Sequence, residues 1–381
     1  MNIRSKLPHV GTTIFTVMTN RARELGAINL AQGFPDYDAP AKLKELLAHH
    51  VAAGHNQYAP MIGVAELREQ IALKLGASYG RVPNVDSEIT VTLGATEALF
   101  SAIVSLVHPG EEVILFDPSY DSYAPAVIAV GGRPIHIPLD PPNFRIDWDR
   151  VRAAISPRTR LVMINTPHNP ITTVIPRAEL DILAEILRPT DALVISDEVY
   201  EHMIYDGARH ASIVEHPELY ERGVAVFSFG KTMHATGWRV GYAVAPPDIT
   251  REIRRVHQFN TFSIAQPLQL AIADFLEQTP EHNAGLSAFY QAKRDRFLEL
   301  LRDSRFTWTP AAGSFFQLLD FSAIAEDSDV DFADKVLRQA GVASIPVSPF
   351  YVAPPKLTVL RFCFAKNDAT LAAAAEKLCK L

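Results

Sequence analysis

Residues 160–165 read RLVMIN, residues 192–196 read ALVIS and residues 224–228 read VAVFS. Each run is apolar almost throughout, and longer stretches with the spacing of helices separate one run from the next. Strands that are apolar on both faces are typical of a parallel sheet covered by helices on its two sides. The three runs therefore predict an α/β fold built on a largely parallel sheet.

Four further runs extend this pattern and bring the predicted sheet to seven strands. They cover residues 89–93, 112–116, 134–138 and 240–245. Polar residues and glycines crowd the positions that follow several of these runs. In an open α/β sheet, ligands collect beyond the carboxyl ends of the strands. We therefore expect the functional site at that edge of the sheet.

The rest of the chain has a different pattern. A helix is predicted over residues 41–53 and a long amphipathic helix over residues 282–301, followed by a βαβα tail over residues 314–320, 331–339, 357–365 and 368–378. We expect three parts: an N-terminal arm that joins a small domain (1–40), a large domain (41–285) and the remainder of the small α+β domain (286–381). A cleft between the two domains is the expected binding site.

The composition excludes several classes of protein. The 381 residues are 48% hydrophobic and carry a formal net charge of −7, so the chain fills a sizeable core and has no overall positive field for nucleic acid or an anionic membrane. The only two cysteines, Cys363 and Cys379, cannot build a disulfide framework or a four-thiolate zinc site, and no metal site is predicted. With neither an apolar leader nor a membrane-length apolar run, a cytoplasmic location is expected.

Lys231 is the candidate nucleophile, because it follows the run 224–228 in the stretch Phe229-Gly230-Lys231-Thr232. A lysine held at a strand end and partly desolvated loses its proton near neutral pH and can form a Schiff base with an aldehyde. A phosphate-binding P-loop also ends in Gly-Lys-Thr, but it needs a glycine at position 225, which is Ala225 here.

An aldehyde cofactor such as pyridoxal phosphate needs an acid for its ring nitrogen and donors for its phenolic oxygen. Asp197 ends a buried strand, where an unpaired carboxylate is costly, so it is the candidate acid. Tyr200 and Asn169 also follow strand ends and could donate to the phenolic oxygen. Taken alone, Asp197 could instead be a helix cap or a solvent-facing loop acid, and Tyr200 and Asn169 could be ordinary turn residues.

The same cofactor needs a phosphate site and a ring on which to stack. Ala95 and Thr96 lie between a strand and a helix predicted from residue 97, where free N–H groups and the helix dipole favour an anion. Ser228 and Arg239 could add a hydroxyl and a guanidinium, and Tyr120 could stack on the ring.

Arg361 lies within an apolar strand, so it should pair with a carboxylate, which could be an internal one or one from a ligand.

The candidate residues and the motifs around them, in their order along the chain, resemble those of the class I pyridoxal-phosphate-dependent aminotransferases of fold type I. The resemblance extends along nearly the whole chain. The motifs are NTPHNP at 165–170, SDEVY at 196–200, SFGKT at 228–232 and GWRVG at 237–241. Within that class, AQGFPD at 31–36, NQYAP at 56–60 and LRFCFAK at 360–366 are similar to the bacterial methionine aminotransferase branch, which is close to the kynurenine and glutamine transaminases.

The resemblance implies a role for each matching residue. Lys231 would bind the cofactor aldehyde covalently and transfer protons in a ping-pong reaction, and the chain would form a homodimer. Asp197 would bind the pyridine nitrogen, Tyr200 and Asn169 the phenolic oxygen, and Tyr120 the ring face. The phosphate would be held by Ala95, Thr96, Ser228, Arg239 and Tyr58 of the partner subunit, and the substrate carboxylate by Gly33, Asn169 and Arg361.

Phe34 and Tyr37 suggest an apolar side-chain pocket that favours methionine and aromatic donors, although ordinary loop packing explains them equally well. A β-lyase acting on cysteine conjugates shares the carbanion intermediate of transamination, so the sequence does not separate the two reactions. A non-catalytic regulatory domain that keeps the fold but not the turnover is a further alternative. One departure from the family is visible: Asn169-Pro170 is followed by Ile171-Thr172, where the family has a residue and then glycine. The geometry of that turn is therefore open.

Overall fold

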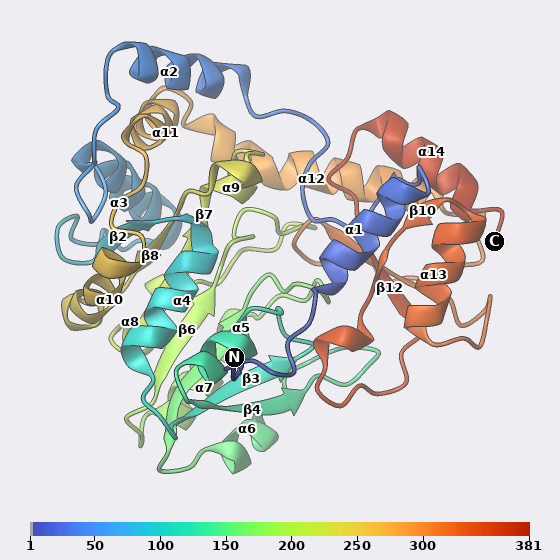
Figure 1. The fold of residues 1–381 in the computed structure, drawn as a ribbon, viewed down its shortest axis with the longest axis horizontal. Coiled ribbons are helices and arrows are strands. Elements are labelled where there is room, and N and C mark those ends of the chain that lie inside the picture. Colours follow the sequence, from blue (N-terminus) through green and yellow to red (C-terminus); the bar gives the residue numbers. More distant parts are fainter. Residues whose placement is uncertain (1–2) are drawn as a thin grey trace.

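The seven predicted strands form one sheet in the computed structural model, which describes residues 3–381 (Figure 1). Strand β8 is antiparallel to both of its neighbours, and the other neighbouring strands are parallel. The mostly parallel seven-stranded sheet is thus confirmed. Its strands lie in the order β2 (Ile89–Thr92), β8 (Gly241–Val244), β7 (Gly223–Ser228), β6 (Leu193–Asp197), β5 (Thr159–Asn165), β3 (Glu112–Asp117) and β4 (Arg133–Pro138).

Helices cover both faces of this sheet, as the unbroken apolar runs require. In β5, Val162 and Ile164 enter the hydrophobic cluster of one face, whereas Leu161 and Met163 enter that of the other. The first face is covered by α2 (Ala41–Ala52), α3 (Ala65–Tyr79), α6 (Trp148–Ala154), α7 (Arg177–Leu187), η1 (Ile213–Glu215), α8 (Pro217–Tyr220), α9 (Phe229–Thr232) and α11 (Gln266–Gln278), and the second by α4 (Gly94–Leu106), α5 (Tyr123–Ala129) and α10 (Pro247–Asn260).

A third hydrophobic cluster joins the N-terminal segment to the C-terminal third of the chain. Helix α1 lies beside β10 although the two are far apart in sequence, and β1 pairs with β10 in parallel (Figure 1). The division into 1–40, 41–285 and 286–381 stays a prediction, because this cluster also includes Val199 and Tyr200 and the long helix begins at Glu281. The N-terminal segment and the C-terminal third contain the elements α1 (Ile14–Glu24), β1 (Ile28–Asn29), α12 (Glu281–Leu300), β9 (Phe316–Asp320), α13 (Asp329–Gln339), β10 (Val342–Ala343), β11 (Ile345–Pro346), η3 (Ser348–Phe350), β12 (Val359–Cys363) and α14 (Asp368–Leu378).

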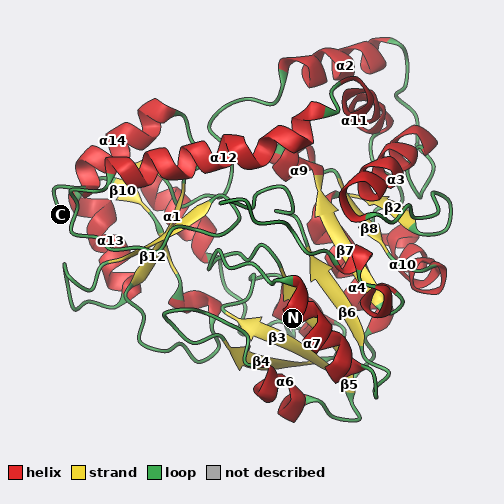
Figure 2. Ribbon diagram, turned by 180° about the vertical axis from the view of Figure 1, so that it is seen from behind, coloured by secondary structure: helices red, strands yellow, loops and turns green. Residues whose placement is uncertain are grey.

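The long helix α12 runs from the side of α11 to the side of α14, where it packs against α14 (Figure 2). Strands β11, β12 and β9 form a second, antiparallel sheet in that part of the molecule. Within residues 3–381, no helix combines the length and the apolarity that crossing a bilayer requires.

Two expectations need correction. The tail is not a plain βαβα unit, because β10 and β11 lie between α13 and β12; each has two residues, which is too short to show any periodicity. Helix α4 begins at Gly94, three residues before the predicted start. Gly94 has a φ of +72°, which glycine tolerates and which lets the chain turn from β2 directly into the helix.

Candidate functional site

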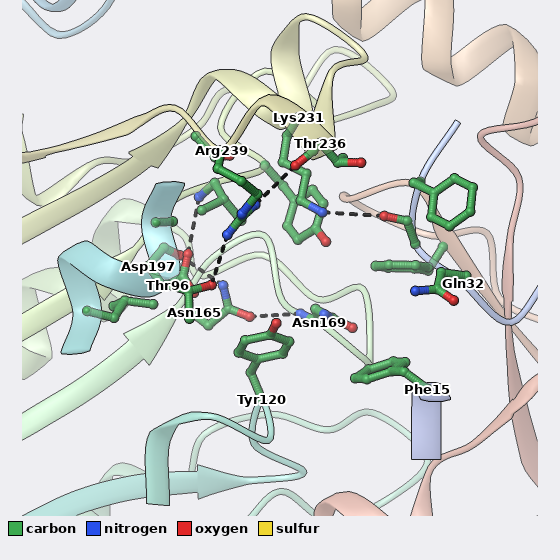
Figure 3. A pocket seen from close by; sticks show the side chains of 18 of the residues that line it. Phe15, Gln32, Thr96, Tyr120, Asn165, Asn169, Asp197, Lys231, Thr236 and Arg239 are labelled. Atoms are coloured by element: carbon green, nitrogen blue, oxygen red, sulfur yellow. Dashed lines mark hydrogen bonds between the residues drawn. The ribbon is translucent and has the colours of Figure 1, made fainter. Parts of the chain in front are cut away.

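All of the predicted site residues except Tyr58 line one cavity of about 260 Å³ (Figure 3). The cavity lies at the carboxyl ends of β5, β6 and β7, where the small domain's residues close it. The predicted residues that line it are Gly33, Ala95, Thr96, Tyr120, Asn169, Asp197, Tyr200, Ser228, Lys231, Arg239 and Arg361.

Lys231 extends into this cavity from α9, the single helical turn that follows β7. Its Nζ donates to the carbonyl oxygen of Gly33 at 3.4 Å and lies 5.5 Å from the centre of the Tyr200 ring. Burial lowers the pKa of Lys231 to about 8, and the nearby guanidinium of Arg239 acts in the same direction. The neutral, nucleophilic amine is therefore accessible close to neutral pH.

Asp197 is the last residue of β6, and its side chain is buried. The Tyr123 hydroxyl donates to Oδ2 at 2.5 Å, and the Val199 N–H donates to Oδ1 at 3.4 Å. Neither partner is a cation, and burial raises the pKa of Asp197 to about 6. A ligand that brings a positive charge to this carboxylate would remove the cost of burying it.

Asn169 and Arg361 are joined on the other side of the cavity. Arg361 donates to Asn169 Oδ1 and, at 2.7 Å, to the carbonyl oxygen of Ala31. Its guanidinium lies 3.8 Å from the centre of the Phe316 ring, and its Nε has no partner among the described residues. Burial lowers the pKa of Arg361 to about 10, so it stays charged.

None of these contacts of Arg361 is with a carboxylate, although a buried guanidinium would favour one. Of the two possible partners left open by the sequence, the geometry thus supports a carboxylate from a ligand. Asn169 is held in place as well, since its N–H donates to Asn165 Oδ1 at 2.8 Å and Asn165 Nδ2 donates to the Asp197 carbonyl at 2.9 Å.

The first turn of α4 faces Arg239. The guanidinium donates to the Thr236 carbonyl at 3.1 Å and to Thr96 Oγ1 at 3.5 Å. A Cβ added to Gly94 would lie 2.8 Å from Arg239 Nη2, so a larger residue there would displace the guanidinium. Free N–H groups, the positive helix end and a guanidinium together make a site for a dianion such as phosphate.

Tyr58 lies outside the cavity. Its side chain is 84% exposed, and its ring makes an edge contact with Phe262 at 5.5 Å between centres. This position is compatible with the expectation that Tyr58 serves the site of a second subunit. Tyr37 also departs from expectation: its ring packs against His234 and Phe289 instead of lining the cavity, whereas Phe34 does line it.

The turn after Asn169-Pro170 is closed by a hydrogen bond although it contains no glycine. Thr172 has a φ of +63°, in the left-handed region, and its N–H donates to the His168 carbonyl at 3.0 Å. The departure therefore places a β-branched residue in a strained conformation without opening the turn.

Sequence reasoning missed several residues of the site. Tyr123 was not predicted, although it lies three residues after Tyr120 in the same loop and α5 start. Asn165 is the last residue of β5, just as Asp197 is the last residue of β6. This position at a strand end could have identified Asn165 as a site residue from the sequence. Other unpredicted lining residues include Phe15, Gln32, Thr236 and Phe316. Gln32 and Thr236 lie close in sequence to the predicted Gly33 and Arg239, whereas Phe15 and Phe316 come from segments that contain no predicted site residue.

Comparison with known proteins gives a consistent result. The family model described as "Aminotransferase class I and II" matches residues 26–378. Methionine aminotransferase of Escherichia coli is 53% identical over 99% of this chain and 98% of its own length. Human kynurenine–oxoglutarate transaminase 1 is 33% identical over 94% of this chain and 93% of its own. The crystal structure of YbdL from Escherichia coli, reported to identify a methionine aminotransferase function, superposes with a TM-score of 0.98 at 53% identity and covers both chains fully.

Proposed function

Because the chain belongs to the class I and II aminotransferase family and is an aminotransferase, we propose that it moves the amino group of methionine and of aromatic amino acids to a 2-oxo acid. Class I aminotransferases use pyridoxal phosphate, and we propose this cofactor here. The observation that carries the proposal is the meeting of Lys231, Asp197 and Arg361 in one cavity.

The residues present fit the cofactor. The buried carboxylate of Asp197 lacks a cationic partner and would hold a protonated pyridine nitrogen, while Tyr200 and Asn169 would donate to the phenolic oxygen. The first turn of α4, with Ser228 and Arg239, would hold the phosphate. When bound, pyridoxal phosphate supplies an aldehyde that condenses with amines and a ring that withdraws electrons from the substrate Cα.

The chain's own residues then orient the substrate and move its proton. Arg361 and Asn169 hold the substrate carboxylate, which fixes the direction of the Cα–H bond. Lys231 Nζ accepts the proton from Cα and later donates it. Its lowered pKa of about 8 means that about half of the amine is neutral near pH 8 and can act as a base. General acid–base transfer of this kind contributes roughly 10² to 10⁴ in rate.

The preference for methionine and aromatic donors rests on the relatives and on the apolar rings of the cavity. Phe15, Phe34 and Phe316 line it, and none of them can pair with a side-chain carboxylate. We therefore expect methionine among the donors with the highest kcat/KM in a panel of amino acids tested against several oxo acids. Aspartate as the best donor would contradict the preference, and pyruvate with ammonia formed without any oxo acid would show elimination instead.

We also propose a cytoplasmic homodimer in which Tyr58 of the partner subunit reaches the phosphate site. Support comes from the exposed ring of Tyr58, its neighbour Phe262 and the further exposed ring of Phe259, which is 85% exposed. Large exposed apolar rings that lie together are typical of a subunit interface.

The central test is covalent labelling of Lys231. Borohydride reduction of the protein saturated with pyridoxal phosphate, followed by peptide mapping, should place the pyridoxyl group on Lys231. Lys231→Ala should lose both the label and nearly all turnover, whereas Lys335→Ala, which changes a lysine of α13 outside the cavity, should keep both. A label elsewhere, or wild-type turnover in Lys231→Ala, would refute the proposed function.

A further inference from the structure

A short segment of the N-terminal arm is bound to the start of the last helix. Residues 32–34 of this segment line the cavity, and the Gly33 carbonyl accepts from Lys231. Two residues later, Asp36 Oδ1 accepts from the Asn367 N–H at 2.5 Å, and Asp36 Oδ2 accepts from the Thr370 hydroxyl at 2.6 Å. Both donors lie at the N-terminus of α14.

Asp36 occupies the place of a helix cap. Asn367 is the N-cap residue of α14, yet its own side chain makes no capping hydrogen bond; its Nδ2 instead donates to the Asp36 carbonyl at 3.2 Å. A carboxylate near a helix N-terminus is stabilised by the free N–H groups and by the helix dipole. The arm is thus attached to α14 through both the side chain and the backbone of Asp36.

A second contact fixes the same segment closer to the cavity. Lys366, which is buried, donates from Nζ to the Phe34 carbonyl at 2.7 Å, and its ammonium lies 4.8 Å from the centre of the Phe34 ring. On the opposite side, a Cβ added to Gly33 would lie 2.7 Å from the Phe316 ring. The segment 32–36 therefore has little freedom between Phe316 and the start of α14.

From these contacts we infer that Asp36, together with Lys366, is a positioning residue for the amino-acid substrate. We name the contacts of Asp36 and Lys366 with residues 34 and 367–370 the Asp36 clasp. The clasp fixes the positions of Gly33 and Phe34 relative to Lys231 and Arg361. It therefore affects the affinity for the substrate, although neither Asp36 nor Lys366 contacts the reacting atoms. This inference rests on the proposed aminotransferase function.

The test compares Asp36→Ala with Asp147→Ala. Asp147 is the matched control, because its carboxylate caps α6, away from the cavity, by accepting from the N–H groups of Asp149 and Arg150. In Asp36→Ala we expect the KM for methionine to rise roughly 10-fold while kcat stays within about twofold, since a displaced binding segment weakens ground-state and transition-state binding alike. Asp147→Ala should leave KM unchanged.

Two milder variants keep the inference testable if Asp36→Ala folds poorly. Asp36→Asn retains an acceptor for the Asn367 N–H and should restore most of the lost affinity, and Thr370→Val removes one bond only and should raise KM by a smaller factor. An unchanged KM in all three variants, or a loss confined to kcat, would overturn the role of the clasp.

Hydrogen exchange separates this inference from the proposed function, because it needs no substrate. The Phe34 N–H donates to the Gln32 carbonyl at 3.0 Å, and we expect its exchange in the holoenzyme to speed up at least about tenfold in Asp36→Ala but not in Asp147→Ala. Unchanged exchange would refute the clasp even if transamination is confirmed. If exchange is faster in Asp36→Ala but the wild-type protein has no transaminase activity, the clasp remains as a structural feature, and its role in substrate binding is refuted along with the proposed function.

Discussion

At the scale of single residues, the site depends on groups that burial makes reactive. Lys231 and Asp197 lie in one cavity, and burial moves their pKa values toward neutrality from opposite directions, to about 8 and about 6. Desolvation disfavours the charged form of each group, so the amine loses its proton more easily and the carboxyl keeps its proton to higher pH. Burying the charged forms of these two groups lowers the stability of the folded protein, and a bound ligand of opposite charge would remove this loss.

For Asp197 this cost predicts a pH-dependent stability. The pKa of Asp197 is about 6 in the folded protein, compared with the ordinary 3.8 of an aspartate, so the folded state binds the proton more tightly. The free energy of unfolding therefore falls as pH rises from about 4 to 6. Above pH 6, cofactor-free Asp197→Asn should therefore be more stable than the wild type by about 1 to 3 kcal/mol. Urea unfolding at pH 4 and pH 7.5 measures the difference, which should nearly vanish at the lower pH. An equal difference at both pH values would contradict the assignment.

Thr172 predicts a stabilising substitution. A left-handed conformation costs a residue with a Cβ about 1 to 2 kcal/mol, whereas glycine adopts it freely but loses about 0.5 to 1 kcal/mol through the flexibility of the unfolded chain. Thr172→Gly should thus raise the free energy of unfolding by up to about 1 kcal/mol. Thr173→Gly, at a neighbour outside the left-handed region, is the control and should destabilise. Equal losses in both variants would show that Thr172 is not strained.

At the scale of elements, a buried ion pair holds α3 against the turn that follows β6. Lys74 of α3 donates to Glu201, which also accepts from the Tyr79 hydroxyl at 2.5 Å, and Lys74 donates to the Tyr242 hydroxyl at 2.9 Å. Glu201 directly follows Tyr200, so this pair supports the turn that brings Tyr200 into the cavity.

Breaking this pair should be costly and non-additive. Lys74→Met leaves Glu201 buried without its cation, and we expect a loss of about 3 to 5 kcal/mol in the free energy of unfolding. The double variant Lys74→Met/Glu201→Gln should lose less than the sum of the two single losses by about 1 to 3 kcal/mol. Urea unfolding of the four proteins gives this coupling. Additive losses would mean that the two groups do not interact.

At the scale of the whole molecule, the proposed dimer makes each site depend on two chains. If Tyr58 acts across the interface, Tyr58→Ala should lower activity about 10- to 100-fold, the value of a hydrogen bond to a charged group. Mixing inactive Lys231→Ala with Tyr58→Ala should then restore about a quarter of the wild-type rate, because half of the randomly formed dimers contain one intact site. The separate proteins are the controls. A mixture no more active than their sum would place Tyr58 outside the partner's site.

The amino-acid sequence was enough to predict the seven strands of a mostly parallel sheet and the residues at their ends, because apolar runs and strand-end positions are local properties of the chain. It therefore predicted Lys231, Asp197 and Asn169 as members of one site, and the structure places them in one cavity. The two-residue strands β10 and β11 could not be predicted, since they exist only through pairing with distant strands.

Which side chains come into contact became clear only from the folded structure. Arg361 reaches Asn169, Tyr123 reaches Asp197, and Asp36 caps a helix near the other end of the chain. Such pairs are separated by tens to hundreds of residues, and no spacing rule links them. Their contacts follow from how helices and sheets pack once the cores close, because packing fixes distances that local backbone preferences leave free.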